Sequence, residues 1–452
     1  MFSLAMRSLR HRAPAFAASF LAMLLGATMI MAFASMLDTA GGAGVSSADE
    51  ETLVTMASVV GGWGLILVLF AVASTLTLAV RQRAAEIALL KSVGATPAQV
   101  RRMILGETAV LALAAYALAI VPGLLGGRAL LTLLQDTDQV TATVQHAFGP
   151  VALAMGFWVT FAASMGAALL TARRAVRMRV TESLLDAAAG PRRTSRKRIV
   201  GGIGFLLLAT DLAVITATVM RGEGTEAMQT AGQTSIWASI GFALLGPVLV
   251  RRVAGLPAAP LARFGGGSGH LAVQNIRRRA HQLAGALAPI ILFTGIGTGT
   301  LYMQQIDSAA IAAEGAVPND MQKNIETLNL VVIGMIVLFA AIMLINTLVA
   351  TTVHRRGEFG RQRLAGATPG QVYGMIALES AVLTVTGVLF GLVASLFTIL
   401  PFNYARTGTA VPDVGPGTFL GIVAVAAALA MVTSLAATGR TLRTPAVQAV
   451  AV

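Results

Sequence analysis

The residues of this chain best suited to binding another molecule lie in a 26-residue segment that occurs twice. Thirteen of the 26 residues from Glu86 to Leu111 recur, in register and without a gap, from Glu358 to Leu383. The two copies read EIALLKSVGATPAQVRRMILGETAVL and EFGRQRLAGATPGQVYGMIALESAVL. No nucleophile, base and oxyanion donor come together along the chain, so we predict no catalytic residue. The chemistry indicated by the repeat is docking of a partner.

The turn inside each copy carries local signals for a helix–turn–helix corner. Gly94 is placed to end the first helix, because glycine adopts the positive φ of a helix C-terminus. Thr96 is then a good N-cap, Pro97 a good first helical residue, and Gln99 completes a T-x-x-Q capping box. The second copy repeats every element in the same order, with Gly366, Thr368, Pro369 and Gln371.

A rigid corner repeated on the same side of both halves is a suitable docking surface. We predict that the docking residues are Gly94, Ala95, Thr96, Pro97, Gln99 and Val100, with Gly366, Ala367, Thr368, Pro369, Gln371 and Val372 in the second copy. Four acids flank the turns as supporting charges: Glu86, Glu107, Glu358 and Glu379. For Glu107 and Glu379, pairing with a nearby arginine is the plainer role. The alternative is a well-capped turn needed only for folding, and the duplication favours docking.

Other candidate residues lie inside apolar stretches. Asp211 sits near the centre of LLLATDLAVITATV, where an acid is costly unless it faces a polar interior. Substrate contact, proton relay and a packing role for a hydrogen-bonded carboxyl remain open. Asn346 suits an interhelical hydrogen bond better than substrate contact. The chain has no cysteine and five histidines without paired ligand spacing, so we predict no metal site.

The composition places these residues in a membrane protein. Hydrophobic residues make up 56% of the chain and charged residues only 12%, about half the usual share of a soluble protein. Stretches of about 20 apolar residues, enough to cross a bilayer, recur along the whole length. The sequence predicts an all-α protein with ten transmembrane helices, at about 15–36, 54–80, 105–134, 150–172, 199–219, 233–250, 281–303, 328–352, 373–400 and 417–438.

The charges then orient the helices. With the N-terminus in the cytoplasm, 29 of the 33 Lys and Arg residues fall on the cytoplasmic side. This bias predicts that both termini are cytoplasmic and places both corners there. The net charge of +13 is explained by topology, so we do not expect nucleic-acid binding. Basic segments of this kind also favour contact with anionic membrane lipids.

Acids show the opposite distribution. Thirteen of the 20 Asp and Glu residues fall in the predicted outer segments. Ordinary solvation of short loops is the plainer interpretation, and attraction of cationic ligands is the alternative.

The repeat defines three parts of the chain: a four-span repeat at 1–186, basic linkers with a two-span insert at 187–267, and a second four-span repeat at 268–452. An insert of two spans keeps both repeats in the same orientation, so they form a parallel pseudo-dimer. Short basic amphipathic segments, 4–10 and 271–277, precede the first span of each repeat and suit helices lying in the membrane interface.

At these residues the chain resembles the FtsX-like permease family, the membrane subunits of MacB-type (type VII) ABC transporters. The shared pattern is E-x-x-x-x-(K/R)-x-x-G-A-(T/S)-x-x-Q-(I/V), followed by an apolar run and an acid. It appears here from Glu86 to Glu107 and again from Glu358 to Glu379. The resemblance covers both four-span repeats. The insert resembles that of ten-span members, whereas the large outer domain usual in MacB-type members is missing from both repeats.

The resemblance implies that the two corners are coupling helices that dock on cytoplasmic ABC ATPase subunits, two per chain. ATP and Mg²⁺ are then held by the partner ATPase, since the chain contains no G-x-x-x-x-G-K-[ST] motif and we expect no enzymatic activity of its own. The location it implies is the bacterial cytoplasmic membrane.

Two functions are compatible with these features. The first is a permease that exports an amphipathic substrate, or extracts it from the membrane, by mechanotransmission; an antimicrobial peptide, a drug or a lipid would fit. The alternative is a signalling or scaffold protein that an ABC ATPase drives without moving solute. The short outer segments favour transport, because they leave little surface for an outer partner.

Overall fold

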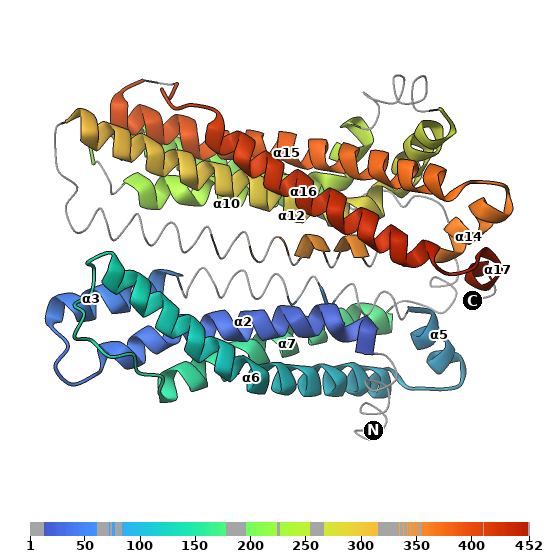
Figure 1. Ribbon diagram of the computed structural model, residues 1–452, viewed down its shortest axis with the longest axis horizontal. Coiled ribbons are helices and arrows are strands. Elements are labelled where there is room, and N and C mark those ends of the chain that lie inside the picture. The colour runs from blue at the N-terminus through green and yellow to red at the C-terminus, as the bar shows by residue number, and fades with distance from the viewer. Residues whose placement is uncertain are drawn as a thin grey trace. The chain divides into compact units, whose positions relative to one another are not determined.

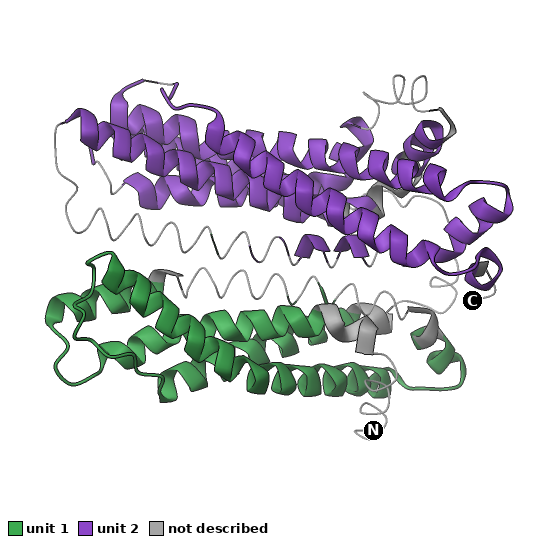
Figure 2. Ribbon diagram, in the orientation of Figure 1, with its two compact units in different colours: residues 1–189, 318–335 green, residues 190–317, 336–452 purple. Residues whose placement is uncertain are grey.

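The computed structural model describes residues 13–60, 84–177, 196–223, 227–253, 266–314, 355–409 and 411–450, with a few isolated residues at 72–76 and 334–352. Within these ranges every regular element is a helix. The chain divides into two compact units (Figure 2). Unit 1 contains residues 1–189 and 318–335, and unit 2 contains residues 190–317 and 336–452.

Unit 1 is built around three long helices that pack side by side (Figure 1). Its described elements are α2 (Ala13–Ala40), α3 (Ser47–Thr55), the short π-helix η1 (Met56–Val60), α5 (Ala84–Ser92), α6 (Pro97–Asp136) and α7 (Pro150–Arg177). Helix α2 contacts both α6 and α7. Ala27 and Met31 of α2 pack against Ala119 of α6 in the middle of the unit, and small residues there let the helices approach closely.

Unit 2 is centred on α12 and α15. Its described elements are α9 (Arg196–Thr218), α10 (Ala227–Val253), α12 (Gly266–Ala313), α14 (Arg356–Leu364), α15 (Pro369–Thr407), α16 (Gly417–Leu442) and α17 (Ala446–Val450). Helix α10 packs on both α12 and α15, and α9 packs on α10. Helix α16 lies along α15 and α12, while α14 and α17 contact each other beside the second corner (Figure 1).

The two-span insert thus groups with the second repeat. At their contact, the Thr234 and Thr398 hydroxyls lie 2.7 Å apart, and the backbone N–H of Ser235 donates to Thr398 Oγ1 at 3.0 Å. These hydroxyls are buried and satisfy one another, which suits an apolar environment where unpaired polar groups are costly.

Eight helices within the described residues are long and apolar enough to cross a membrane: α2, α6, α7, α9, α10, α12, α15 and α16. Each coincides with one of the ten predicted spans. The other two, at about 54–80 and 328–352, lie largely outside the described residues. The all-α prediction and the presence of two similar helical repeats are confirmed.

One local prediction was wrong. Residues 271–277 were expected to form a separate helix in the membrane interface, yet they are part of α12, which continues without a break to Ala313. No proline interrupts the helix before Pro289. The residues between 277 and Pro289 are mostly good helix formers, so no local signal ends the helix there. The equivalent segment 4–10 lies outside the described residues.

Candidate docking corners

Both copies of the repeated segment form the predicted corner between two helices. In the first, Gly94 has a φ of 99°, its N–H donates to the Lys91 carbonyl at 3.1 Å, and the N–H of Ala95 donates to the Leu90 carbonyl at 2.9 Å. This pair of bonds is a Schellman motif, which ends α5 abruptly. We call the end of a unit that carries its corner the connector end, and the opposite end the far end.

The second corner has the same backbone geometry. Gly366 has a φ of 96°, its N–H donates to the Arg363 carbonyl at 3.1 Å, and the N–H of Ala367 donates to the Gln362 carbonyl at 2.9 Å. A side chain at either glycine would be strained by the positive φ, although the space beside each is open. The glycines are therefore required by the backbone and not by packing.

Both capping boxes are formed. The N–H of Gln99 donates to Thr96 Oγ1 at 3.3 Å, and the Thr96 N–H donates to Gln99 Oε1 at 2.8 Å. The corresponding distances between Gln371 and Thr368 are 3.3 and 2.9 Å. Pro97 and Pro369 are the first residues of α6 and α15. These caps fix the start of two helices that continue through the length of their units.

The corner tips are exposed, and the residues behind them are buried. Thr96, Pro97 and Gln99 are exposed, as are Thr368, Pro369 and Gln371, while Ala95 and Ala367 are partly exposed. Val100 and Val372, by contrast, are buried. In unit 2 the cluster behind the corner contains Ala272, Phe359, Val372, Met375 and Ile376. The buried apolar residues that follow each turn therefore anchor the corner, and the polar tip stays exposed.

The two tips differ in their apolar content. Leu89 and Val93 at the first corner are 68% and 81% exposed. At the positions 272 residues later the chain has Arg361 and Ala365, and the large apolar residue at the second tip is Leu364, which is 58% exposed. Unpacked apolar side chains on a polar, protruding turn are typical of a contact surface.

The second corner is braced by a buried ion pair. Arg355 donates through Nη1 and Nη2 to the two carboxylate oxygens of Glu379, and through Nε to Glu358 at 3.2 Å. Asn275 of α12 also donates to Glu379, at 2.9 Å. Burial alone would lower the pKa of Arg355, but the carboxylates of Glu379 and Glu358 raise it above its usual value. Pairing of Glu379 with an arginine was expected; Arg355 and Asn275 were not identified from the sequence.

A second arginine joins this corner to the end of the chain. Arg363 Nη1 donates to the carbonyls of Leu442 and Thr444, at 3.1 and 2.8 Å. It thereby links α14 to the last turn of α16. In the sequence, Arg363 was distinguished only by its match to the Lys or Arg of the family pattern.

The other predicted supporting charges are less fully defined. Glu107 is buried in α6, at the position equivalent to Glu379. Glu86 lies in α5, but its side chain is outside the described residues. Burial lowers the pKa of Lys91, which precedes the first turn.

Asp211 does not point into the interior of unit 2. It is exposed on α9, on a face that also exposes Leu207 and Val214. A role in packing the insert against the rest of unit 2 is therefore not what the structure shows for this carboxyl. Asn346 lies outside the described residues. Asp211 lies within α9 and is not part of either corner.

Two acids at the far end of unit 1 have internal partners. Asp38 of α2 accepts hydrogen bonds from the N–H groups of Gly149, Val151 and Ala152 at 2.8–3.1 Å, and so caps α7. Asp49 accepts from Thr141. Burial would raise the pKa of Asp49, but its hydrogen bonds with Ser46 and Thr141 lower it overall. These two acids stabilise the far end, in addition to the solvation expected for short loops.

The same region predicts a pH dependence. His146 lies in the segment between α6 and α7, and Ser35 Oγ is 3.1 Å from its Nε2. Burial and the positive charge of Arg128 lower the pKa of His146, while Asp38 opposes them. Because folding lowers the pKa of His146, the neutral imidazole contributes to the stability of the folded protein. This contribution is fully present above the unfolded pKa of 6.5 and is lost as the pH falls through the folded pKa.

We therefore expect thermal unfolding of the detergent-solubilised protein to occur at a lower temperature at pH 5.5 than at pH 7.5. A His146→Gln variant should lose part of this difference. An identical pH dependence in the variant would exclude His146 as a contributor.

Within the described residues there is no cluster of three His, Cys, Asp or Glu side chains that could hold a metal ion. What the corners offer is two exposed turns with the same hydrogen bonds, each at the start of a helix that runs the length of its unit. This arrangement is suited to receiving and transmitting a mechanical displacement.

Comparison with known proteins agrees with this geometry. A search of curated proteins found no match to the chain. The pattern of the FtsX-like permease C-terminal family, however, matches it twice, at residues 58–180 and 330–446. Each match contains one corner together with the long helices that follow it. The chain therefore belongs to the FtsX-like permease family, as a duplicated, multi-pass membrane subunit of the ABC-transporter type.

Proposed function

We propose that the two corners dock two cytoplasmic ABC ATPase subunits, one on each repeat. The observation that carries this proposal is the pair of matching turns whose tips expose apolar side chains, Leu89 and Val93 on one and Leu364 on the other. A turn required only for folding needs its caps and the buried residues behind it, and the exposed apolar side chains of these turns are additional to both. Family membership supports the same partner, since permeases of this kind work with cytoplasmic ABC ATPases.

The helices that start at the corners supply the path of transmission. Helix α6 has 40 residues and α15 has 39. At 1.5 Å per residue, each is about 60 Å long, roughly twice the thickness of the hydrocarbon core. A displacement applied at a capped helix start is transmitted to the far end, because the helix is held together by its own backbone hydrogen bonds. Hydrolysis of ATP, with Mg²⁺, on the partner would supply the displacement.

We propose that the motion exports an amphipathic substrate or extracts it from the membrane. In the described residues, the far-end connections are short: 41–46, 137–149 and 408–416 link their helices without an additional domain. A substrate that partitions into the bilayer reaches the apolar helix faces directly and needs no separate binding domain. The antimicrobial peptides, drugs and lipids that fit this description share an apolar body and a polar end.

The docking proposal predicts a stepwise loss of ATPase subunits. Wild-type complex purified in detergent without nucleotide should contain two ATPase copies per chain. Val93→Asp or Leu364→Asp alone should leave one copy, and the double variant none, because each change places a charge on one apolar contact. Native mass spectrometry of the complexes gives the stoichiometry directly.

Val411→Asp is the matched control, since Val411 is 75% exposed in the far-end segment between α15 and α16. It should retain both ATPase copies. Wild type that recovers no ATPase, or a double variant that keeps both copies, would contradict the docking proposal. If the intact complex hydrolyses ATP in liposomes but does not move a labelled amphiphile, then transport is wrong and the signalling role is favoured.

A further inference from the structure

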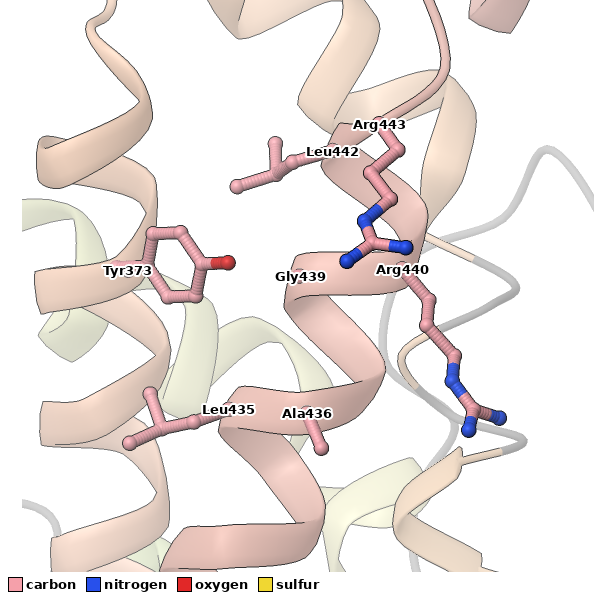
Figure 3. A pocket seen from close by; sticks show the side chains of 7 residues that line it. All are labelled: Tyr373, Leu435, Ala436, Gly439, Arg440, Leu442 and Arg443. Carbon is pink, nitrogen blue, oxygen red and sulfur yellow. The ribbon is translucent and has the colours of Figure 1, made fainter.

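A pocket opens between α15 and α16 at the connector end of unit 2, with a volume of about 620 Å³. Tyr373 lines it from the second turn of α15, and the remaining lining residues come from the end of α16 (Figure 3). They include Leu435, Gly439, Arg440, Leu442 and Arg443. The pocket is therefore partly basic and partly apolar.

The absence of a side chain at position 439 keeps the pocket open. A Cβ atom at Gly439 would lie 2.7 Å from the hydroxyl oxygen of Tyr373, so a larger residue would displace the tyrosine. Figure 3 shows the hydroxyl of Tyr373 directed at this point, with Leu435 and Leu442 on the same side of α16.

The two arginines of the pocket are available for an anion. Both are exposed, and neither forms an ion pair with any acid that the structure describes. They are also not needed to cap α16, because Arg363 already donates to the carbonyls of Leu442 and Thr444. Arg355, by contrast, is buried and occupied by Glu379.

We propose that this pocket binds the phosphate headgroup of an anionic phospholipid. Guanidinium groups bind phosphate oxygens through charge-assisted hydrogen bonds, and the Tyr373 hydroxyl adds a further donor. The site lies at the end of α16, a helix long and apolar enough to cross the membrane, so headgroups are at the right depth. Leu435 lies two turns further back along α16, where an acyl chain would continue from the headgroup. A free anion would gain nothing from this apolar part.

The first repeat offers a built-in control. Residues 168–177 align with 434–443, so Arg174 and Arg177 correspond to Arg440 and Arg443. Tyr373 and Gly439, however, have no equivalents of the same type in the first repeat. Arg101 stands at the position of Tyr373, and Arg173 at the position of Gly439. The first repeat thus keeps the charges and lacks the residues that open the pocket.

Native mass spectrometry of the full-length protein, titrated with dioleoyl-phosphatidylglycerol in detergent, tests the proposal. We expect the tightest lipid adduct to weaken about 30-fold in Arg440→Gln/Arg443→Gln, as each arginine beside an anionic lipid contributes close to a factor of five. Arg174→Gln/Arg177→Gln should leave this adduct unchanged. Gly439→Leu keeps both charges but fills the pocket, and should weaken the adduct as well.

Four results would overturn the proposal. Equal losses in the two double-arginine variants would show attraction by net charge alone, and phosphatidylcholine binding as tightly would show that the anionic headgroup is not recognised. Displacement of the lipid by an equal concentration of inorganic phosphate would assign the site to a free anion. If the Arg440/Arg443 variant keeps the lipid adduct and loses a bound ATPase, the pocket is a protein contact and not a lipid site. The lipid titration itself needs no ATPase, so it stands apart from the docking proposal.

Discussion

Replacing Glu379 by alanine should lower the free energy of unfolding by roughly 3–5 kcal/mol, because it leaves a buried guanidinium without its partner. The side chains of Arg355 and Glu379 are only 9% and 4% exposed, and the arginine binds both carboxylate oxygens. Asn275 would lose its carboxylate acceptor at the same time. Chemical denaturation of the protein in detergent, followed by helical circular dichroism, measures the loss.

The comparison with apolar replacement makes this prediction specific. Arg355→Met/Glu379→Met removes both charges and should recover much of the stability lost in Glu379→Ala, since an apolar pair of similar volume costs little in a buried site. Glu358→Gln is the matched control on the same arginine. Its carboxyl is more exposed, at 16%, so we expect a loss of no more than about 1 kcal/mol. A Glu379→Ala variant as stable as wild type would show that Arg355 is solvated by other means.

The corners could be predicted residue by residue because their hydrogen bonds are local. The bond between Thr96 and Gln99 joins residues three apart, and the Schellman bond from Ala95 to Leu90 joins residues five apart. Such contacts depend on residue types within one or two turns, which the sequence shows directly. The duplication then favoured a docking surface over a turn needed only for folding.

The brace behind the second corner was only half predictable. Glu379 lies within the repeated segment, but Arg355 lies three residues before it begins, and Asn275 is 104 residues from Glu379. The one signal in the sequence was the 272-residue offset between the repeats, because Arg83 is the residue equivalent to Arg355. Extending the comparison beyond the segment would have found the arginine; nothing local would have found Asn275.

The direction of Asp211 and the position of the insert were not predictable. Every face of α9 near Asp211 is apolar, so the helical period does not say which side packs. The insert contacts α12 and α15 through large apolar residues, and α15 also through hydroxyl groups, and both types are common in all the spans. Only the three-dimensional register brings Thr234 and Thr398 together.

Helices α12 and α15 approach each other closely at Gly391. We therefore expect Gly391→Leu to lower the free energy of unfolding by about 3 kcal/mol, the upper end of the usual range for overpacking a tight core. A Cβ at Gly391 would lie 2.6 Å from Thr294 Cβ and 3.1 Å from the backbone nitrogen of Gly295. Conversely, a Cβ at Gly295 would lie 3.2 Å from the Gly391 carbonyl oxygen. Since backbone faces backbone, no side-chain rotation can make room, and the helices must separate.

Separation of these helices would also disturb α10, which packs on both of them, so the insert should loosen together with the core. Gly421→Leu is the matched control, because no atom lies within 4 Å of a Cβ at that position on α16. It should be neutral or slightly stabilising, as leucine favours helix more than glycine does. Thermal unfolding in detergent and protease sensitivity of the α9–α10 connection measure both effects. Equal stabilities of the two leucine variants would show that α12 and α15 do not meet at Gly295 and Gly391 in the membrane.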